Sequence, residues 1–157
     1  MKVCVVGCGL RTPLVIHGLA HAGLGVSQVA LYDVNARRAA WMAKLCQHIA
    51  AGMGQAPITV AAAAGLEEGV RGSSFVISSI RVGDMEARAR DERLALECGF
   101  AGQETTGPAG FAMAMRTIPV AIEQARVVER LAPKAWLLNF TNPAGIVTEA
   151  MSKHTGV

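Results

Sequence analysis

Two glycines and a carboxylate near the start of the chain have the spacing of a nucleotide-binding site. The first apolar run ends in the sequence GCGLR at residues 7–11, and Asp33 ends the second such run. Glycines allow a tight turn and a close approach to a pyrophosphate, whose charge the N-terminus of the following helix stabilises. A carboxylate after the second strand accepts hydrogen bonds from ribose hydroxyls and repels a 2′-phosphate. The pattern predicts binding of NAD rather than NADP, through Gly7, Gly9, Leu10, Arg11 and Asp33.

Other interpretations of this turn remain open from the sequence. Thr12 stands where the G-x-G-x-x-G pattern has its third glycine. Arg37 and Arg38 would favour a 2′-phosphate if they faced the cofactor, although on a helix they can simply point into water. The turn could also be an ordinary strand end in which Asp33 caps the next helix.

A second group of polar residues lies in the second half of the chain. Glu104 is the one carboxylate of the polar loop GQETTGPAG (102–110), and it lies too far ahead of the following helix to cap it well. Thr105 or Thr106 would cap that helix better, so the loop carboxylate is expected to face a ligand. The other members of this group are Arg81, Arg88 and Asn142.

Ordinary structural roles compete with binding for two of these residues. Arg88 and Glu92 are four residues apart, which is the spacing of an ion pair on a helix surface. Asn142 precedes Pro143, so it could be the N-cap of a helix with Pro143 at its first position. In that case Asn139 could take over the ligand-binding role, because one side-chain oxygen cannot serve both.

Alternating strands and helices are expected to position these residues. Thr12 is predicted as the N-cap of the first helix, and Pro119 is predicted to kink or split a long one. The alternation predicts an α/β fold with a doubly wound parallel sheet, Rossmann-like, as in the nucleotide domain of lactate and malate dehydrogenases. Arg81 would then follow the fourth strand, near the nicotinamide side of the site. The predicted strands cover 2–6, 28–33, 58–61, 74–80 and 135–140, and the predicted helices cover 12–23, 36–51, 65–71, 84–98, 109–131 and a segment from Pro143.

Three segments resemble the signature blocks of family 4 glycoside hydrolases, most closely those of its 6-phospho-β-glucosidases. They are IRVGDMEARARDERLAL (80–96), GQETTGPAG (102–110) and LLNFTNPAGIVTEAM (137–151). The resemblance implies an enzyme that needs NAD and a divalent metal, usually manganese, and that cleaves a phosphorylated sugar by oxidation at C3 followed by elimination. It also implies that Arg88 and Asn142 bind substrate, and that Glu104 raises the basicity of a catalytic tyrosine.

The chain departs from this family pattern in ways that limit what it can do alone. Asp84 and Ala109 replace glycines of the blocks, and the family's metal ligands and tyrosine base lie beyond them. Tyr32 is the only tyrosine, and its place on a strand before Asp33 rules it out as the base. Residues 1–157 are therefore expected to be an NAD-binding domain with part of the substrate pocket, without metal ligands, lacking the C-terminal metal and catalytic domain and inactive by itself.

Composition excludes several other classes of protein. The net charge of +3 is small and the basic residues are scattered, which excludes a nucleic-acid footprint, and no apolar run is long enough to span a membrane. The four cysteines have no metal-binding spacing and are expected to be buried thiols in the cytoplasm. Self-association is expected from apolar surface left bare. The alternatives are a 2-hydroxy-acid dehydrogenase of the lactate or malate type and a non-catalytic NAD-binding module.

Overall fold

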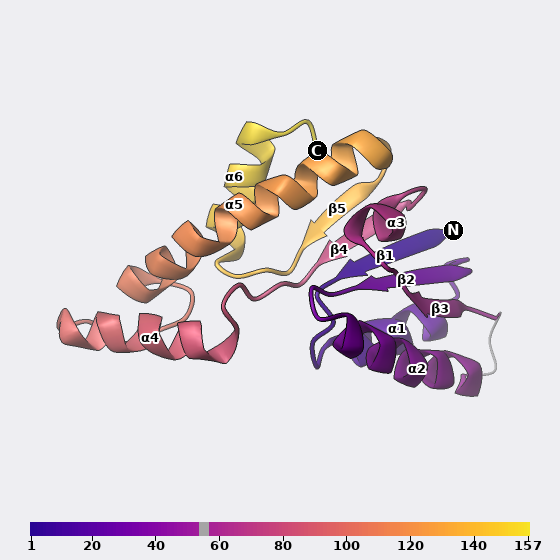
Figure 1. Cartoon of the computed structure of the whole chain (residues 1–157), viewed down its shortest axis with the longest axis horizontal. Coiled ribbons are helices and arrows are strands. Elements are labelled where there is room, and N and C mark those ends of the chain that lie inside the picture. Colours follow the sequence, from indigo (N-terminus) through magenta and orange to yellow (C-terminus); the bar gives the residue numbers. More distant parts are fainter. Residues whose placement is uncertain (54–56) are drawn as a thin grey trace. The chain divides into compact units, whose positions relative to one another are not determined.

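The computed structural model describes residues 1–53 and 57–157, which divide into two compact units. The first unit, Met1–Ile80 with Val127–Leu138, contains a five-stranded sheet (Figure 1). Its central strand β1 (Lys2–Val6) pairs in parallel with β2 (Gln28–Tyr32) and with β4 (Phe75–Ser78). The strand order is β3-β2-β1-β4-β5, with β3 over Thr59–Ala62 and β5 over Trp136–Asn139.

Helices cover both faces of β1, because its KVCVV run is apolar on both sides. Val3 and Val5 belong to the core that α1 (Thr12–His21) and α2 (Ala36–Gly52) close on one face. Helix α3 (Leu66–Val70) packs on the other face so closely that a Cβ at Gly69 would lie 3.0 Å from the Cys4 sulfur. The predicted doubly wound parallel sheet is confirmed.

Two predictions about helix ends and breaks are wrong. Thr12 is not the N-cap of α1: it is the first helical residue, its side chain is buried, and Arg11 precedes it as N-cap. The split predicted at Pro119 is also wrong, because α5 (Gly107–Leu131) is continuous, whereas the alternative of a kink there stays a prediction. Pro119 lies on the exposed side of α5, where water can bind the carbonyl left without a partner, so the missing hydrogen bond does not break the helix.

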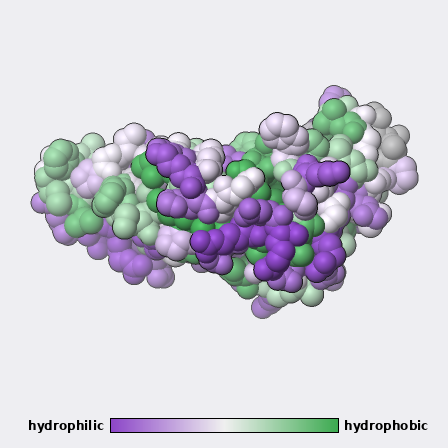
Figure 2. Space-filling view, turned by 90° about the horizontal axis from the view of Figure 1, so that it is seen from above, coloured by the Kyte–Doolittle hydropathy of each residue, from purple (hydrophilic) through white to green (hydrophobic). Residues whose placement is uncertain are grey.

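The second unit comprises Arg81–Arg126 and Asn139–Val157. It contains α4 (Asp84–Glu97), the first part of α5, and α6 (Ala144–His154). The space-filling view in Figure 2 shows apolar residues exposed at the end formed by α4 and the start of α5; Phe100 and Phe111 are among the exposed large apolar side chains of this unit.

Asn142 does not cap α6, so the structural role that competed with substrate binding for this residue is not found. Pro143 is the N-cap residue, and no side chain caps the helix. Asn139 organises the preceding loop instead: its amide nitrogen donates to the Thr148 hydroxyl at 2.9 Å, and its oxygen accepts from the Thr141 backbone at 2.9 Å. The Asn139 side chain is thus already engaged in hydrogen bonds to Thr141 and Thr148.

Across the described residues, no helix is both long enough and apolar enough to cross a membrane.

Candidate functional site

The turn after β1 has a geometry that only glycine permits at its first position. Gly7 has a φ of +94°, and a Cβ there would lie 2.4 Å from the Ser79 carbonyl oxygen. Gly9 differs, since a Cβ there would meet nothing within 4 Å. Leu10 and Arg11 are exposed, and no side chain caps the N-terminus of α1. The Thr12 N–H donates to the Gly9 carbonyl oxygen at 3.0 Å, and Pro13 has no N–H. The turn therefore presents open space beside Gly9 at a helix N-terminus that no side chain caps, and such helix ends bind anions.

Asp33 joins the end of β2 to this turn. One carboxylate oxygen accepts a hydrogen bond from the Cys8 N–H at 2.9 Å, and the other accepts from the Asn35 N–H at 2.8 Å. The Arg38 guanidinium lies 3.7 Å from the first oxygen. Asp33 is not the cap of α2, because the Asn35 side chain accepts from the Arg38 N–H in that role. Asp33 is thus a buried carboxylate that is hydrogen-bonded to the backbone of the glycine turn.

The cysteines differ in exposure. Cys4, Cys8 and Cys46 are buried free thiols, as predicted, whereas Cys98 is exposed, which corrects the prediction for that residue. Burial raises the pKa of Cys4 and of Cys8 to about 12 and that of Cys46 to about 11, because a thiolate is poorly solvated there. Cys8 therefore stays protonated beside Asp33.

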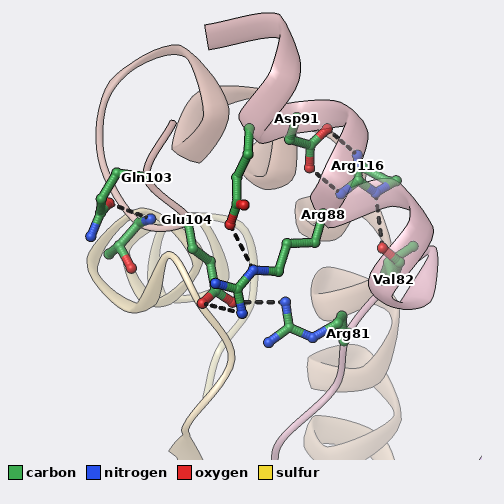
Figure 3. Close-up of polar contacts among 9 residues, drawn as sticks. Arg81, Val82, Arg88, Asp91, Gln103, Glu104 and Arg116 are labelled. Carbon is green, nitrogen blue, oxygen red and sulfur yellow. Dashed lines mark hydrogen bonds and ion pairs between the residues drawn. The ribbon is translucent and has the colours of Figure 1, made fainter. Parts of the chain in front are cut away.

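Arg81, Arg88, Glu92 and Glu104 form a second group, here called the arginine–glutamate cluster (Figure 3). Glu104 lies between the two arginines, 2.7 Å from Arg81 Nη1 and 3.3 Å from Arg88 Nη1. Arg88 also donates from Nε to Glu92 at 2.7 Å, so the predicted helix-surface pair does form. The hydrogen bond to Glu92 and the charge of Glu104 raise the pKa of Arg88. The structure thus brings together three of the predicted site residues, Arg81, Arg88 and Glu104.

The loop that carries Glu104 is held by a residue that the sequence analysis did not single out. The Gln103 side-chain oxygen accepts hydrogen bonds from the N–H groups of Thr105 and Thr106, at 2.7 and 2.8 Å. Thr106 directly precedes the first residue of α5, and its hydroxyl also donates to the Gln103 oxygen at 3.0 Å, so capping by Thr105 or Thr106 stays a prediction. A glutamine two residues before a threonine is a weak sequence signal, and no spacing rule would have found it.

One predicted residue of this group, Asn142, remains to be placed, and an ion pair that was not predicted lies beside the cluster. Asn142 is half-buried, and within residues 1–53 and 57–157 the ion pairs of the arginine–glutamate cluster join only its own members. Arg116 and Asp91, which the sequence analysis did not select, form an ion pair beside the cluster with a shortest distance of 2.6 Å (Figure 3). Residues 1–53 and 57–157 contain no group of three or more His, Cys, Asp or Glu side chains that could hold a metal ion.

A comparison with protein-family models matches residues 2–157 to the family 4 glycosyl hydrolases. The 6-phospho-β-glucosidase of Escherichia coli (strain K12) is 38% identical to the chain over an alignment of 161 positions, which covers 99% of this chain and 36% of that protein. The chain therefore spans about a third of the length of this relative.

Solved structures agree with this match. A 6-phospho-α-glucosidase from gut microorganisms, in complex with NAD and Mn²⁺, has a TM-score of 0.89 at 26% identity, over 98% of this chain and 35% of that one. The 6-phospho-β-glucosidase of Thermotoga maritima, with NAD and glucose-6-phosphate, has a TM-score of 0.86 at 29% identity, over 95% of this chain and 36% of that one.

The predicted likeness to lactate and malate dehydrogenases is confirmed for the fold, and for the fold only. A malate dehydrogenase from Archaeoglobus fulgidus has a TM-score of 0.73 at 21% identity, over all of this chain and 46% of that one. Sequence identity at this level carries no information on activity. The family match favours a glycosidase and does not favour the alternative of a 2-hydroxy-acid dehydrogenase.

Proposed function

The chain belongs to the family 4 glycosyl hydrolases, and from this membership we propose that it forms the N-terminal, NAD-binding part of an enzyme that hydrolyses 6-phospho-β-glucosides. The Escherichia coli relative bears the name of that activity, and similar structures were solved with NAD. The observation in this chain that carries the proposal is the glycine turn hydrogen-bonded to the buried Asp33 carboxylate. The preference for a β-glucoside rests on the likeness of the QETTG loop to the β-type blocks.

The residues of the glycine turn fit a dinucleotide. A pyrophosphate would approach the open side of Gly9 at the N-terminus of α1, whose dipole stabilises its charge, with the backbone of Leu10 and Arg11 beside it. Each Asp33 oxygen already accepts one N–H and keeps a lone pair for a ribose hydroxyl. When bound, NAD supplies the hydride acceptor, and Arg81 is proposed to lie on its nicotinamide side.

Calorimetric titration of the 157-residue chain with NAD and NADP tests this part of the proposal. Asp33 is expected to make NAD bind at least about tenfold more tightly than NADP, because its charge repels a 2′-phosphate. Arg38 does not reverse this expectation, since it lies toward Asp33 at 3.7 Å. Tighter binding of NADP, or binding of neither dinucleotide, would contradict the proposal.

The arginine–glutamate cluster is proposed to face the phosphorylated sugar. Arginine forks match phosphate and carboxylate oxygens, and Arg88 is proposed to bind the substrate together with Asn142. Glu104 is proposed to act on a tyrosine base supplied by another part of the longer protein. A divalent metal, manganese in the family pattern, is proposed only for that longer protein, because the described residues do not fit a metal site.

The chain alone is proposed to be inactive, since the base and the metal ligands are expected elsewhere. Incubation with 4-nitrophenyl β-glucoside 6-phosphate, NAD and Mn²⁺ tests for activity, and release of nitrophenolate would contradict the proposed inactivity.

A cytoplasmic location is proposed as well, because phosphorylated sugars are charged and the four cysteines are free. Self-association is proposed from the exposed apolar side chains and is argued in the Discussion.

A further inference from the structure

Arg116 makes three directed hydrogen bonds, and none of them involves the arginine–glutamate cluster (Figure 3). Its Nη1 and Nη2 donate to the two oxygens of Asp91, at 3.1 and 2.6 Å. Its Nε donates to the Val82 carbonyl oxygen at 2.9 Å. A bidentate guanidinium–carboxylate pair fixes orientation as well as distance, and Asp91 is buried with 8% of its surface exposed. The pair raises the pKa of Arg116, which stays charged.

Both hydrogen-bond partners of Arg116 are close in sequence to an arginine of the arginine–glutamate cluster. Val82 follows Arg81 directly, and Asp91 lies on α4 three residues after Arg88, which places it on the same side of the helix. Arg116 itself belongs to α5. One side chain therefore holds the turn that carries Arg81 and the helix that carries Arg88.

The turn between these two arginines packs against Arg116. Gly83 has a φ of +84°, and a Cβ there would lie 2.5 Å from Ala87 Cβ and 3.2 Å from Arg116 Nε. The backbone of this turn thus depends on a glycine and on the carbonyl contact to Arg116.

The contacts within the cluster are less directional. Arg81 Nη1 and Glu104 Oε1 are 2.7 Å apart and screened from water, yet neither atom makes a hydrogen bond of good geometry in the described part of the chain. Arg88 is oriented by its hydrogen bond to Glu92, whereas no comparable bond orients the Arg81 side chain among the described residues. The position of Arg81 therefore depends on its backbone.

We propose that Arg116 is a positioning residue for the arginine–glutamate cluster. With Asp91 it holds the Arg81–Gly83 turn and α4 so that Arg81 and Arg88 approach Glu104 from two segments. It does not bind the substrate itself. This inference rests on the proposed function, in that the two arginines are taken to bind a phosphorylated sugar.

Arg116→Lys tests the proposal without a ligand, because lysine keeps the charge but cannot form the fork and reach Val82 together. Backbone ¹⁵N order parameters of Arg81–Gly83 are expected to fall from the rigid range, roughly 0.85, to below about 0.6. Arg126→Lys is the matched control, since Arg126 lies on the same helix in an exposed pair with Glu123 and should leave the turn rigid. An equally rigid turn in Arg116→Lys would overturn the proposal.

The affinity for glucose 6-phosphate in two backgrounds gives a second test, which distinguishes positioning of the arginines from a purely structural role. Arg116→Lys is expected to weaken binding about tenfold in the wild-type background and by a smaller factor in an Arg81→Met background, where only its effect through Arg88 is left, because coupled residues are not additive. Equal losses in both backgrounds would overturn the proposal. If the wild-type chain does not bind the sugar phosphate, the proposed function fails at this cluster, and the order parameters still decide the role of Arg116.

Asp91→Asn keeps the proposal testable if Arg116→Lys does not fold. It retains the Arg116 bond to Val82 and weakens only the bond to α4. The Arg81–Gly83 turn is then expected to stay rigid, while the backbone ¹⁵N order parameter of Arg88 on α4 falls. Loss of order at neither arginine would overturn the proposal.

Discussion

At the scale of single residues, Gly7 and Gly9 place different demands on one turn. An alanine at position 7 would have a positive φ and a Cβ in contact with the Ser79 carbonyl. We expect Gly7→Ala to lower the free energy of unfolding by about 2 kcal/mol or more, because strain and overlap add. Gly9→Ala is expected to change stability by no more than about 0.5 kcal/mol, since its Cβ would point into open space.

Gly9, whose substitution is expected to leave stability nearly unchanged, is the glycine whose substitution is expected to weaken NAD binding. The methyl group of Gly9→Ala would occupy the space proposed for the pyrophosphate, so NAD affinity is expected to fall at least about tenfold with the fold intact. Urea denaturation and calorimetry of both variants provide the measurements. Wild-type NAD affinity in Gly9→Ala would place the dinucleotide elsewhere.

The thiols give a residue-scale prediction with a pH dependence. Because burial raises the pKa values of Cys4 and Cys8 to about 12 and of Cys46 to about 11, their reactive thiolates are absent at pH 8 and form only as the pH approaches those values. We expect one thiol per native chain, Cys98, to react with a disulfide reagent at pH 8, and four after denaturation. Cys98→Ser should abolish the native reaction. Labelling of Cys8 at pH 8 would contradict its burial.

At the scale of elements, the start of α4 has an unfavourable backbone conformation. Asp84, the first residue of α4, has a φ of +53° and is the one non-glycine residue with positive φ in the described ranges. Glycine adopts this conformation without steric cost, which explains the glycine that the family blocks have here. Asp84→Gly is expected to be about 1 kcal/mol more stable than Asp84→Ala in urea denaturation, since both lose the carboxylate. Equal stability of the two variants would mean that α4 relaxes its first turn.

The elements also show which parts of the molecule were predictable. Strand β1 was predicted over its observed residues because a continuous aliphatic run ends at Gly7. The Arg88–Glu92 pair followed from helix spacing. The contact between Arg116 and Asp91 joins two helices across 25 residues, and no local pattern encodes it. The split predicted at Pro119 does not occur, because the effect of a proline depends on which side of α5 faces water, which the sequence alone does not settle.

At the scale of the whole molecule, the two units carry different parts of the proposed function. The glycine turn and Asp33 belong to the first unit, and the arginine–glutamate cluster belongs to the second. Each unit also exposes large apolar side chains, including Trp136 in the first and Phe111 in the second. Exposed apolar side chains become costly in water when they form contiguous patches, so they favour association.

Strand β5 is where we expect this association to occur in the isolated chain. It lies at one edge of the sheet, and Trp136 and Leu138 on it are 70% and 40% exposed. Edge strands with apolar side chains pair with other chains. Sedimentation velocity of the 157-residue chain should therefore show a sedimentation coefficient that rises with concentration.

Trp136→Lys is expected to weaken this self-association at least about tenfold, because covering half of a tryptophan of roughly 200 Å² contributes about 2 kcal/mol. The added charge also protects the edge. Trp41→Lys is the matched control: Trp41 is 63% exposed but lies on helix α2 and not on a strand, and its substitution should leave association unchanged. An equal effect of both substitutions would mean that the association depends on general surface hydrophobicity and not on β5. A chain that stays monomeric at all concentrations would show that β5 does not mediate self-association.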